Sequence, residues 1–189
     1  MKSIKLLAFL FISTLVFTGC SDDDDNVPGE VNEEEVITTM TITLTATGQT
    51  DVVLRTQDLD GDGPNAPVLT VSGPFAANTT YTGSIVLLNE TESPAENITE
   101  EIEEEDEEHQ FFYTATGVNA TFAYAGPNDE NGNPVGLNFT LTTGAASTGS
   151  LSFTLRHEPM KTATGVSTGD ITNAGGETDI ETTFSVTVQ

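Results

Sequence analysis

The strongest chemical pattern in the sequence is an acidic loop, DLDGDGPN. Three alternating carboxylates and a glycine stand at positions 1, 3, 5 and 6 of a calcium loop, and they are Asp58, Asp60, Asp62 and Gly63. Such oxygens can converge on one cation because the glycine permits a sharp turn. The twelfth position is Leu69 instead of a bidentate glutamate, and no helix pattern flanks the loop, so an EF-hand is excluded. We predict a calcium loop between strands, with an acidic glycine-rich turn as the alternative.

The only two histidines, His109 and His157, offer a second metal chemistry. Imidazole nitrogens together with carboxylates suit zinc or copper. His109 ends an acidic run, and His157 ends the predicted strand SLSFTLRH on the same parity as its apolar residues. Their long separation in sequence is not a metal-ligand spacing. We therefore favour an exposed His109 and a His157 at the rim of the fold, and a shared zinc or copper site is the alternative.

Three further motif matches predict no site. The segment DENGNPVG, with Asp129, Asn131 and Asn133, has a weaker calcium-like spacing and is predicted to be a turn. GVSTG lies in a loop rich in glycine and threonine, whereas a nucleophile elbow needs a strand, a turn and a helix. HEPMK has Lys161 where a metalloprotease helix needs its second histidine. An enzyme is therefore not predicted.

The single cysteine lies directly after an apolar run and predicts a lipid anchor. Two lysines precede the apolar residues 6–17, which is the pattern of a secretory signal and too short to span a bilayer. The small residues before Cys20 resemble the lipobox of bacterial lipoproteins, in which the cysteine is acylated, although Phe17 departs from its usual aliphatic residue. We predict a signal peptide over 1–19 and lipidation of Cys20, with a plain secretory signal as the alternative.

The acidic block after the cysteine predicts where the protein is displayed. It resembles the tag that directs some lipoproteins to the outer face of the outer membrane, and it consists of Ser21, Asp22, Asp23, Asp24 and Asp25. The chain stays acidic to about Glu35, so we predict that 20–35 forms a flexible, lipidated tether. We expect a lipid-anchored protein of the outer membrane at the cell surface, with attachment facing the periplasm as the alternative.

The charge of the chain limits its partners. Thirty acidic residues face five basic ones, for a formal net charge of −25. Nucleic acid is excluded as a partner because binding to phosphates needs lysine and arginine. The same charge favours cations or basic protein surfaces.

From residue 36 onward, apolar and polar residues alternate with a period of two, which is typical of half-buried strands. Clusters of glycine, proline and asparagine separate the strands, and sustained helical periodicity is absent from the pattern. The predicted strands are 36–47, 51–56, 66–72, 81–89, 110–116, 119–125, 136–143, 150–157 and 178–188. About nine or ten short strands over 36–189 predict one all-β domain, an antiparallel β-sandwich that is immunoglobulin-like or related.

The acidic segment 92–110 departs from this pattern. Ile98 and Ile102 are four residues apart and fit a helix, but they also fit one face of a strand. We favour an edge hairpin that turns near 104–107, because charge at a sheet edge would oppose edge-to-edge aggregation.

Two segments, GLNFTLTTGAASTGSLSFTLRHEP and GGETDIETTFSVTVQ, resemble a group of small bacterial outer-membrane lipoproteins. That group is often identified as the type 1 periplasmic binding fold superfamily. The resemblance implies binding of a small ligand, and the named fold implies two doubly wound α/β lobes around a hinge. The strand pattern predicts a sandwich instead.

Two classes of function follow. The first is a non-enzymatic binding or accessory module at the cell surface, serving an outer-membrane uptake receptor or a small ligand. The second is a protein that binds calcium or another divalent cation, through the Asp58 loop or the acidic segment.

Overall fold

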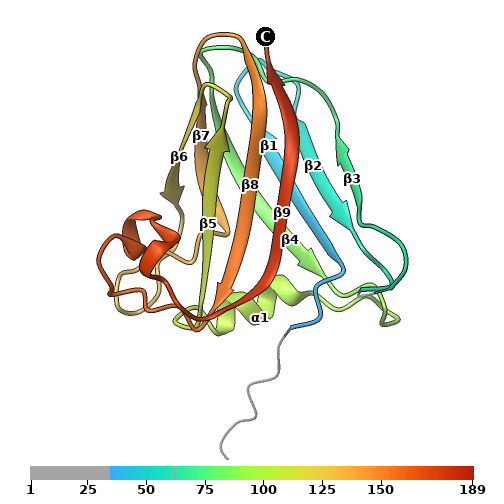
Figure 1. Cartoon of the computed structure of the whole chain (residues 1–189), viewed down its shortest axis with the longest axis vertical. Coiled ribbons are helices and arrows are strands. Elements are labelled where there is room, and N and C mark those ends of the chain that lie inside the picture. The colour runs from blue at the N-terminus through green and yellow to red at the C-terminus, as the bar shows by residue number, and fades with distance from the viewer. Residues whose placement is uncertain (1–34, 62) are drawn as a thin grey trace, which may run out of the picture. The chain divides into compact units, whose positions relative to one another are not determined.

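The computed structural model describes residues 35–61 and 63–189, and within them two antiparallel sheets face each other (Figure 1). The larger sheet has the strand order β3-β2-β1-β4-β7-β6, and the smaller has the order β5-β8-β9. The strands are β1 (Thr39–Thr45), β2 (Val52–Gln57), β3 (Val68–Val71), β4 (Thr80–Leu88), β5 (His109–Thr116), β6 (Ala120–Ala125), β7 (Asn138–Thr143), β8 (Ser147–His157) and β9 (Glu177–Val188). The predicted all-β sandwich is confirmed, with its strands divided six and three and not four and three as in an antibody constant domain.

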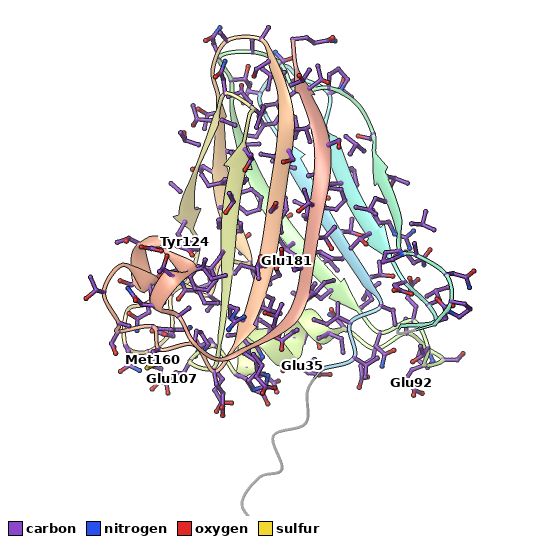
Figure 2. The ribbon with its side chains drawn as sticks, in the orientation of Figure 1. Glu35, Glu92, Glu107, Tyr124, Met160 and Glu181 are labelled. Atoms are coloured by element: carbon purple, nitrogen blue, oxygen red, sulfur yellow. The ribbon has the colours of Figure 1, made fainter. Side chains whose placement is uncertain are left out.

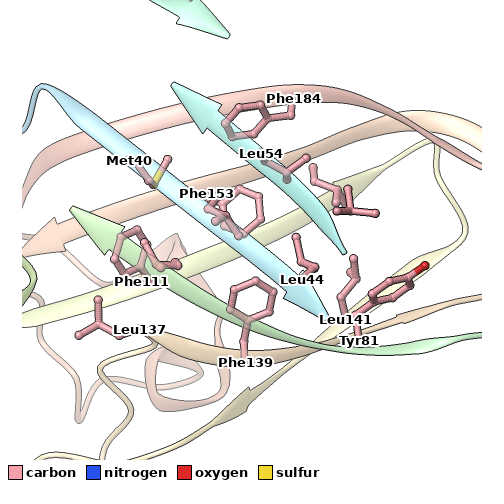
Figure 3. Close-up of a cluster of buried hydrophobic side chains, with 14 of the residues drawn as sticks. Met40, Leu44, Leu54, Tyr81, Phe111, Leu137, Phe139, Leu141, Phe153 and Phe184 are labelled. Carbon is pink, nitrogen blue, oxygen red and sulfur yellow. The ribbon is translucent and has the colours of Figure 1, made fainter. Parts of the chain in front are cut away.

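The core lies between the two sheets and follows the predicted alternation. In β1 the side chains of Met40, Ile42 and Leu44 are fully buried. Those of Phe153 in β8 and Phe184 in β9 meet them from the smaller sheet (Figure 3). Burying such a side chain contributes about 1.5–3 kcal/mol relative to leaving it exposed, so this layer supplies the rigid frame on which the strand ends are held.

The acidic segment is a helix and not an edge hairpin, so that prediction is wrong. Helix α1 (Ile98–Glu104) buries Ile98 and Ile102 and turns its glutamates outward. The Thr99 hydroxyl accepts a hydrogen bond of 2.8 Å from the Leu87 amide, which ties the helix to β4. A one-sided helix of seven residues needs only two apolar side chains, four apart, to pack against the sandwich. In Figure 1 this helix lies across the lower ends of the strands, far from the C-terminus.

Two short 3-10 helices, η1 (Val166–Thr168) and η2 (Ile171–Asn173), complete the described elements between β8 and β9. Within the same residues, no helix has the length and apolar character needed to cross a membrane. The predicted signal peptide, the lipidation site Cys20, the tag Ser21–Asp25 and the loop residue Asp62 lie outside the described residues.

Candidate metal centre

The two histidines meet at the base of the smaller sheet. His109 is the first residue of β5 and His157 is the last of β8, and the antiparallel pairing places them directly opposite each other. Their ring centroids are 4.6 Å apart. His109 is fully buried, so the expectation of an exposed His109 is wrong. Both side chains face inward, like the buried apolar residues of their strands. They lie where the hydrophobic core ends.

A β-bulge brings Asp179 to the same place. Along the β8–β9 pair, Leu155 faces Ile180 and Arg156 faces Thr178, so Asp179 is the extra residue that has no counterpart. Without the bulge, Asp179 would lie on the outward parity of β9, opposite to Phe184. Bulges redirect side chains in this way and are frequent beside functional sites. The Asp179 side chain is only 1% exposed, and its Oδ1 lies 3.7 Å from His157 Nδ1.

Glu35 completes the group from the segment that leads into β1. Its Oε1 lies 2.7 Å from His109 Nε2, and its Oε2 lies 3.3 Å from His157 Nδ1. Its side chain is only 4% exposed. Figure 2 shows Glu35 at the base of the sandwich, where the described chain begins. We refer to Glu35, His109, His157 and Asp179 together as the His–carboxylate cluster.

The spacing of the cluster fits a small metal ion. One ligand atom from each of the four residues can be chosen so that all lie within 4.8 Å of one another. A tetrahedral zinc shell with bonds of about 2.0–2.1 Å separates its ligand atoms by about 3.3–3.4 Å. The distances between imidazole nitrogens and carboxylate oxygens, from 2.7 to 4.0 Å, lie on both sides of that value. The ligand atoms therefore lie near the spacing of such a shell.

A backbone contact orients His109 for this role. Its Nδ1 lies 3.1 Å from the carbonyl oxygen of Glu105, the residue after α1. A carbonyl can only accept, so Nδ1 carries the proton and donates it. In the neutral ring, Nε2 then holds its lone pair toward Glu35. Metal-binding histidines are commonly fixed in this way by a second hydrogen bond.

The surroundings of His109 favour the protonated form of its ring. Burial disfavours the charged ring of His109, but the hydrogen bond and negative charge of Glu35, with Asp179, outweigh it and raise the pKa of His109. Burial likewise opposes ionisation of Glu35, but His109 and His157 lower the pKa of its carboxyl overall. Burial and the charges of Glu96 and Glu35 raise the pKa of nearby Glu101. The surroundings are therefore strongly negative and favour a bound cation.

A second, outward-facing group shares His157. Glu108, His157 and Glu158 also offer ligand atoms within 4.8 Å of one another. The Glu158 amide donates a 2.6 Å hydrogen bond to the Glu108 carbonyl. Gly176 permits this close turn, because a Cβ there would lie 2.0 Å from the His157 carbonyl oxygen. Both glutamates are exposed, so this group forms the solvent side of the cluster.

The Asp58 loop is on the connection between β2 and β3, and its described residues contribute no ligand to the cluster. Asp60 Oδ2 accepts a 2.7 Å hydrogen bond from Asn65 Nδ2, and Asp58 Oδ1 lies 3.3 Å from the Asp60 amide. The bond from Asn65 lowers the pKa of the exposed Asp60 carboxyl. Calcium binding there remains a prediction, because the third carboxylate, Asp62, is outside the described residues.

Asp129 lies in a turn, as predicted, but it is buried and paired. Its Oδ1 accepts hydrogen bonds of 3.0 and 2.7 Å from the amides of Asn131 and Asn133. Its Oδ2 accepts one of 3.1 Å from Lys161 Nζ, which also donates to the Asp106 carbonyl. Lys161, which excluded the metalloprotease motif, is therefore a structural cation.

The sequence pattern did not identify Glu35 or Asp179 as site residues. Glu35 has the same acidic neighbours as the predicted tether, and Asp179 has the outward parity of its strand. The chain matches no protein-family model, no curated protein and no solved structure among those with which it was compared. The chemistry of the His–carboxylate cluster therefore carries the functional argument.

Proposed function

We propose that this protein binds a divalent transition metal, zinc above all, in the His–carboxylate cluster. The observation that supports the proposal is the convergence of two imidazoles and two carboxylates from four distant segments into one buried group. Burying carboxylates is costly unless a cation compensates them. Two carboxylates and two neutral imidazoles balance the charge of one divalent ion.

The donor set favours zinc over calcium. Calcium takes six to eight oxygen ligands at about 2.3–2.6 Å, whereas nitrogen ligands suit zinc and copper. The filled d shell of zinc imposes no geometry, so zinc tolerates some distortion of its usual tetrahedral arrangement. A titration with copper tests whether the same ligands bind copper instead of zinc.

The closed shell favours binding over catalysis. Catalytic zinc sites keep a position open for water or substrate, whereas structural sites fill all four with protein ligands. Here the four side chains are each at most 7% exposed. A non-enzymatic metal-binding protein is the function that this arrangement supports.

A zinc titration of the purified chain tests the proposal. We expect one zinc per chain and a free energy of unfolding that is higher by about 2.7 kcal/mol when free zinc is 100 times its Kd. For a domain of this size that corresponds to a rise in Tm of roughly 5–10 °C. His109→Gln removes a ligand and should lose the response, while Asp60→Ala should keep it. An equal response in His109→Gln would contradict a metal at this cluster.

The proposed setting is a lipid-anchored protein at the surface of the outer membrane. It is supported by the signal pattern, Cys20 and the acidic tag Ser21–Asp25. Cys20→Ser should abolish labelling by a palmitate analogue and release the protein from membranes. Alanines in place of Asp22–Asp25 should keep the label but lose cleavage by protease added to whole cells. Equal cleavage would make the acidic block a spacer only.

An accessory module for an uptake receptor is the second proposed function. It is supported by the edge strand β3, where Val68 and Leu69 are 62% and 47% exposed. An exposed apolar edge strand can extend its sheet with a strand of a receptor. Cross-linking on intact cells should capture an outer-membrane receptor with the parent chain and less of it with Leu69→Lys. Equal capture by both would contradict docking at this edge.

A further inference from the structure

The segment that leads into β1, Glu35–Thr38, is held in two different ways along its length. We call it the junction segment. At its far end, Thr38 is fixed to the larger sheet by backbone groups: its amide donates to Leu88 at 3.0 Å, and its carbonyl accepts from Asp58 at 2.7 Å. The Thr38 hydroxyl also accepts a 2.8 Å hydrogen bond from the Glu90 amide. From Thr38 onward, the chain therefore belongs to the larger sheet.

The near end of the junction segment is held by the side chain of Glu35. Its carboxylate reaches His109 and His157, which both belong to the smaller sheet. Val36, between the two attachments, is 57% exposed. Glu35 and His157 are 122 residues apart in sequence. The cluster therefore joins the start of the described chain to the sheet that does not contain β1.

We infer that the bound metal acts as a clasp, which holds the junction segment on the smaller sheet more firmly than the metal-free contacts of Glu35 with the two histidines do. This inference rests on the metal site proposed above and adds what controls the segment. Three of the four ligands, His109, His157 and Asp179, lie on the paired strands of one sheet and are positioned without the metal. Glu35 is the ligand on the junction segment, and the metal would add to its contacts with the two histidines.

The clasp would set how far the domain can lie from its predicted lipid anchor. Opening of Glu35 and Val36, which precede the core-packed Ile37, would add up to two extended residues, or roughly 7 Å, to the predicted tether. It would also expose the peptide bond after Glu35 to a protease that cleaves after glutamate. Metal loading would then control both the distance of the domain from its anchor and the ease with which protease detaches it.

Limited proteolysis of the full chain by a protease of broad specificity, with zinc and with a chelator, tests the clasp. If opening at Glu35 and Val36 requires release of the metal, cleavage there should slow by about 100-fold when free zinc is 100 times the Kd. Cleavage in the turn between β7 and β8, at the far end of the sandwich, should be unchanged. Mass spectrometry of the fragments locates each cut, and the same protease can be used on variants that lack Glu35.

Two matched variants separate the clasp from zinc binding itself. Glu35→Gln and Asp179→Asn each remove one carboxylate ligand, and both are compared at zinc concentrations that saturate them. Asp179→Asn should still protect the junction segment, and Glu35→Gln should not. Equal protection in both variants would overturn the clasp while leaving the zinc site intact. Absence of zinc binding by the parent chain would instead remove the proposed metal function, and the clasp with it.

Discussion

Two groups of buried charges differ in how they are neutralised. In one, Lys161 and Asp129 bring one positive and one negative charge together at 3.1 Å. Turn amides supply further hydrogen bonds to the same carboxylate. In the His–carboxylate cluster, two carboxylates face two imidazoles, which carry positive charge only when they bind a proton. The first group is complete as a protein structure, whereas the second needs protons or a metal.

The comparison shows that burial of charge alone does not mark a functional site. Burial lowers the pKa of Lys161, which the hydrogen bond and charge of Asp129 oppose. Burial also opposes ionisation of Asp129, but the Asn133 amide and Lys161 lower the pKa of its carboxyl overall. What distinguishes the cluster is its set of donors that a metal prefers.

The largest effect is expected from breaking the complete pair. Lys161→Met leaves Asp129 buried without its cation, which should lower the free energy of unfolding by about 3–5 kcal/mol. Urea denaturation measures the loss, and zinc should raise the free energy of unfolding equally in parent and variant, because the four cluster ligands are untouched. The double variant Lys161→Met/Asp129→Asn should recover part of the loss, since no charge is then left unpaired. A zinc response that differs between Lys161→Met and the parent chain would show that the two groups are one coupled site.

The second prediction concerns pH, where the cluster should behave differently with and without zinc. The folded pKa of His109 is raised, so its contribution is complete below the unfolded value of 6.5 and is lost as pH rises through the folded pKa. The folded pKa of Glu35 is lowered, so its contribution is present above 4.5 and is lost as pH falls through the folded pKa. The metal-free cluster should therefore be most stabilising between these values.

Above that pH window, zinc should make the free energy of unfolding rise with pH, whereas that of the metal-free chain should fall. Zinc displaces the proton from His109, so its affinity should rise about tenfold per pH unit, or about 1.4 kcal/mol, until that proton is already lost. Thermal unfolding from pH 5 to 8, with zinc and with chelator, measures both slopes. Parallel slopes would contradict a shared site for proton and metal, and Asp60→Ala is the control that should follow the parent chain.

The fold was largely predictable because strands depend on local alternation. The strands β1 and β8 bury the parity that the sequence predicts, as Ile42 and Phe153 illustrate. The segment around α1 was mispredicted because Ile98 and Ile102 fit both periods. Its charge suggested an exposed edge, although a helix can expose the same glutamates while burying two residues.

The cluster was only partly predictable because it depends on pairing between distant strands. His109 and His157 were recognised as possible ligands, but their meeting depends on the β5–β8 register. Asp179 could not be placed because the bulge that turns it inward has no signal in an alternating sequence. Glu35 shares its composition with the tether. The acidic loop, whose spacing is local, was the easier pattern to find.

The smallest effect is expected at that loop. Asp58 and Asp60 lie near solvent and make hydrogen bonds within their own turn, so salt screens them more than the buried cluster. Extracellular calcium sites of this type bind at about 0.1–1 mM. We expect calcium at tenfold excess over its Kd to raise Tm by roughly 3–5 °C, which Asp60→Ala should lose and His109→Gln should keep.

Sodium at equal ionic strength is the control, because screening alone stabilises a chain of net charge −25. A calcium response in Asp60→Ala equal to that of the parent would make the loop an acidic turn, and the response would then belong to the glutamates around α1.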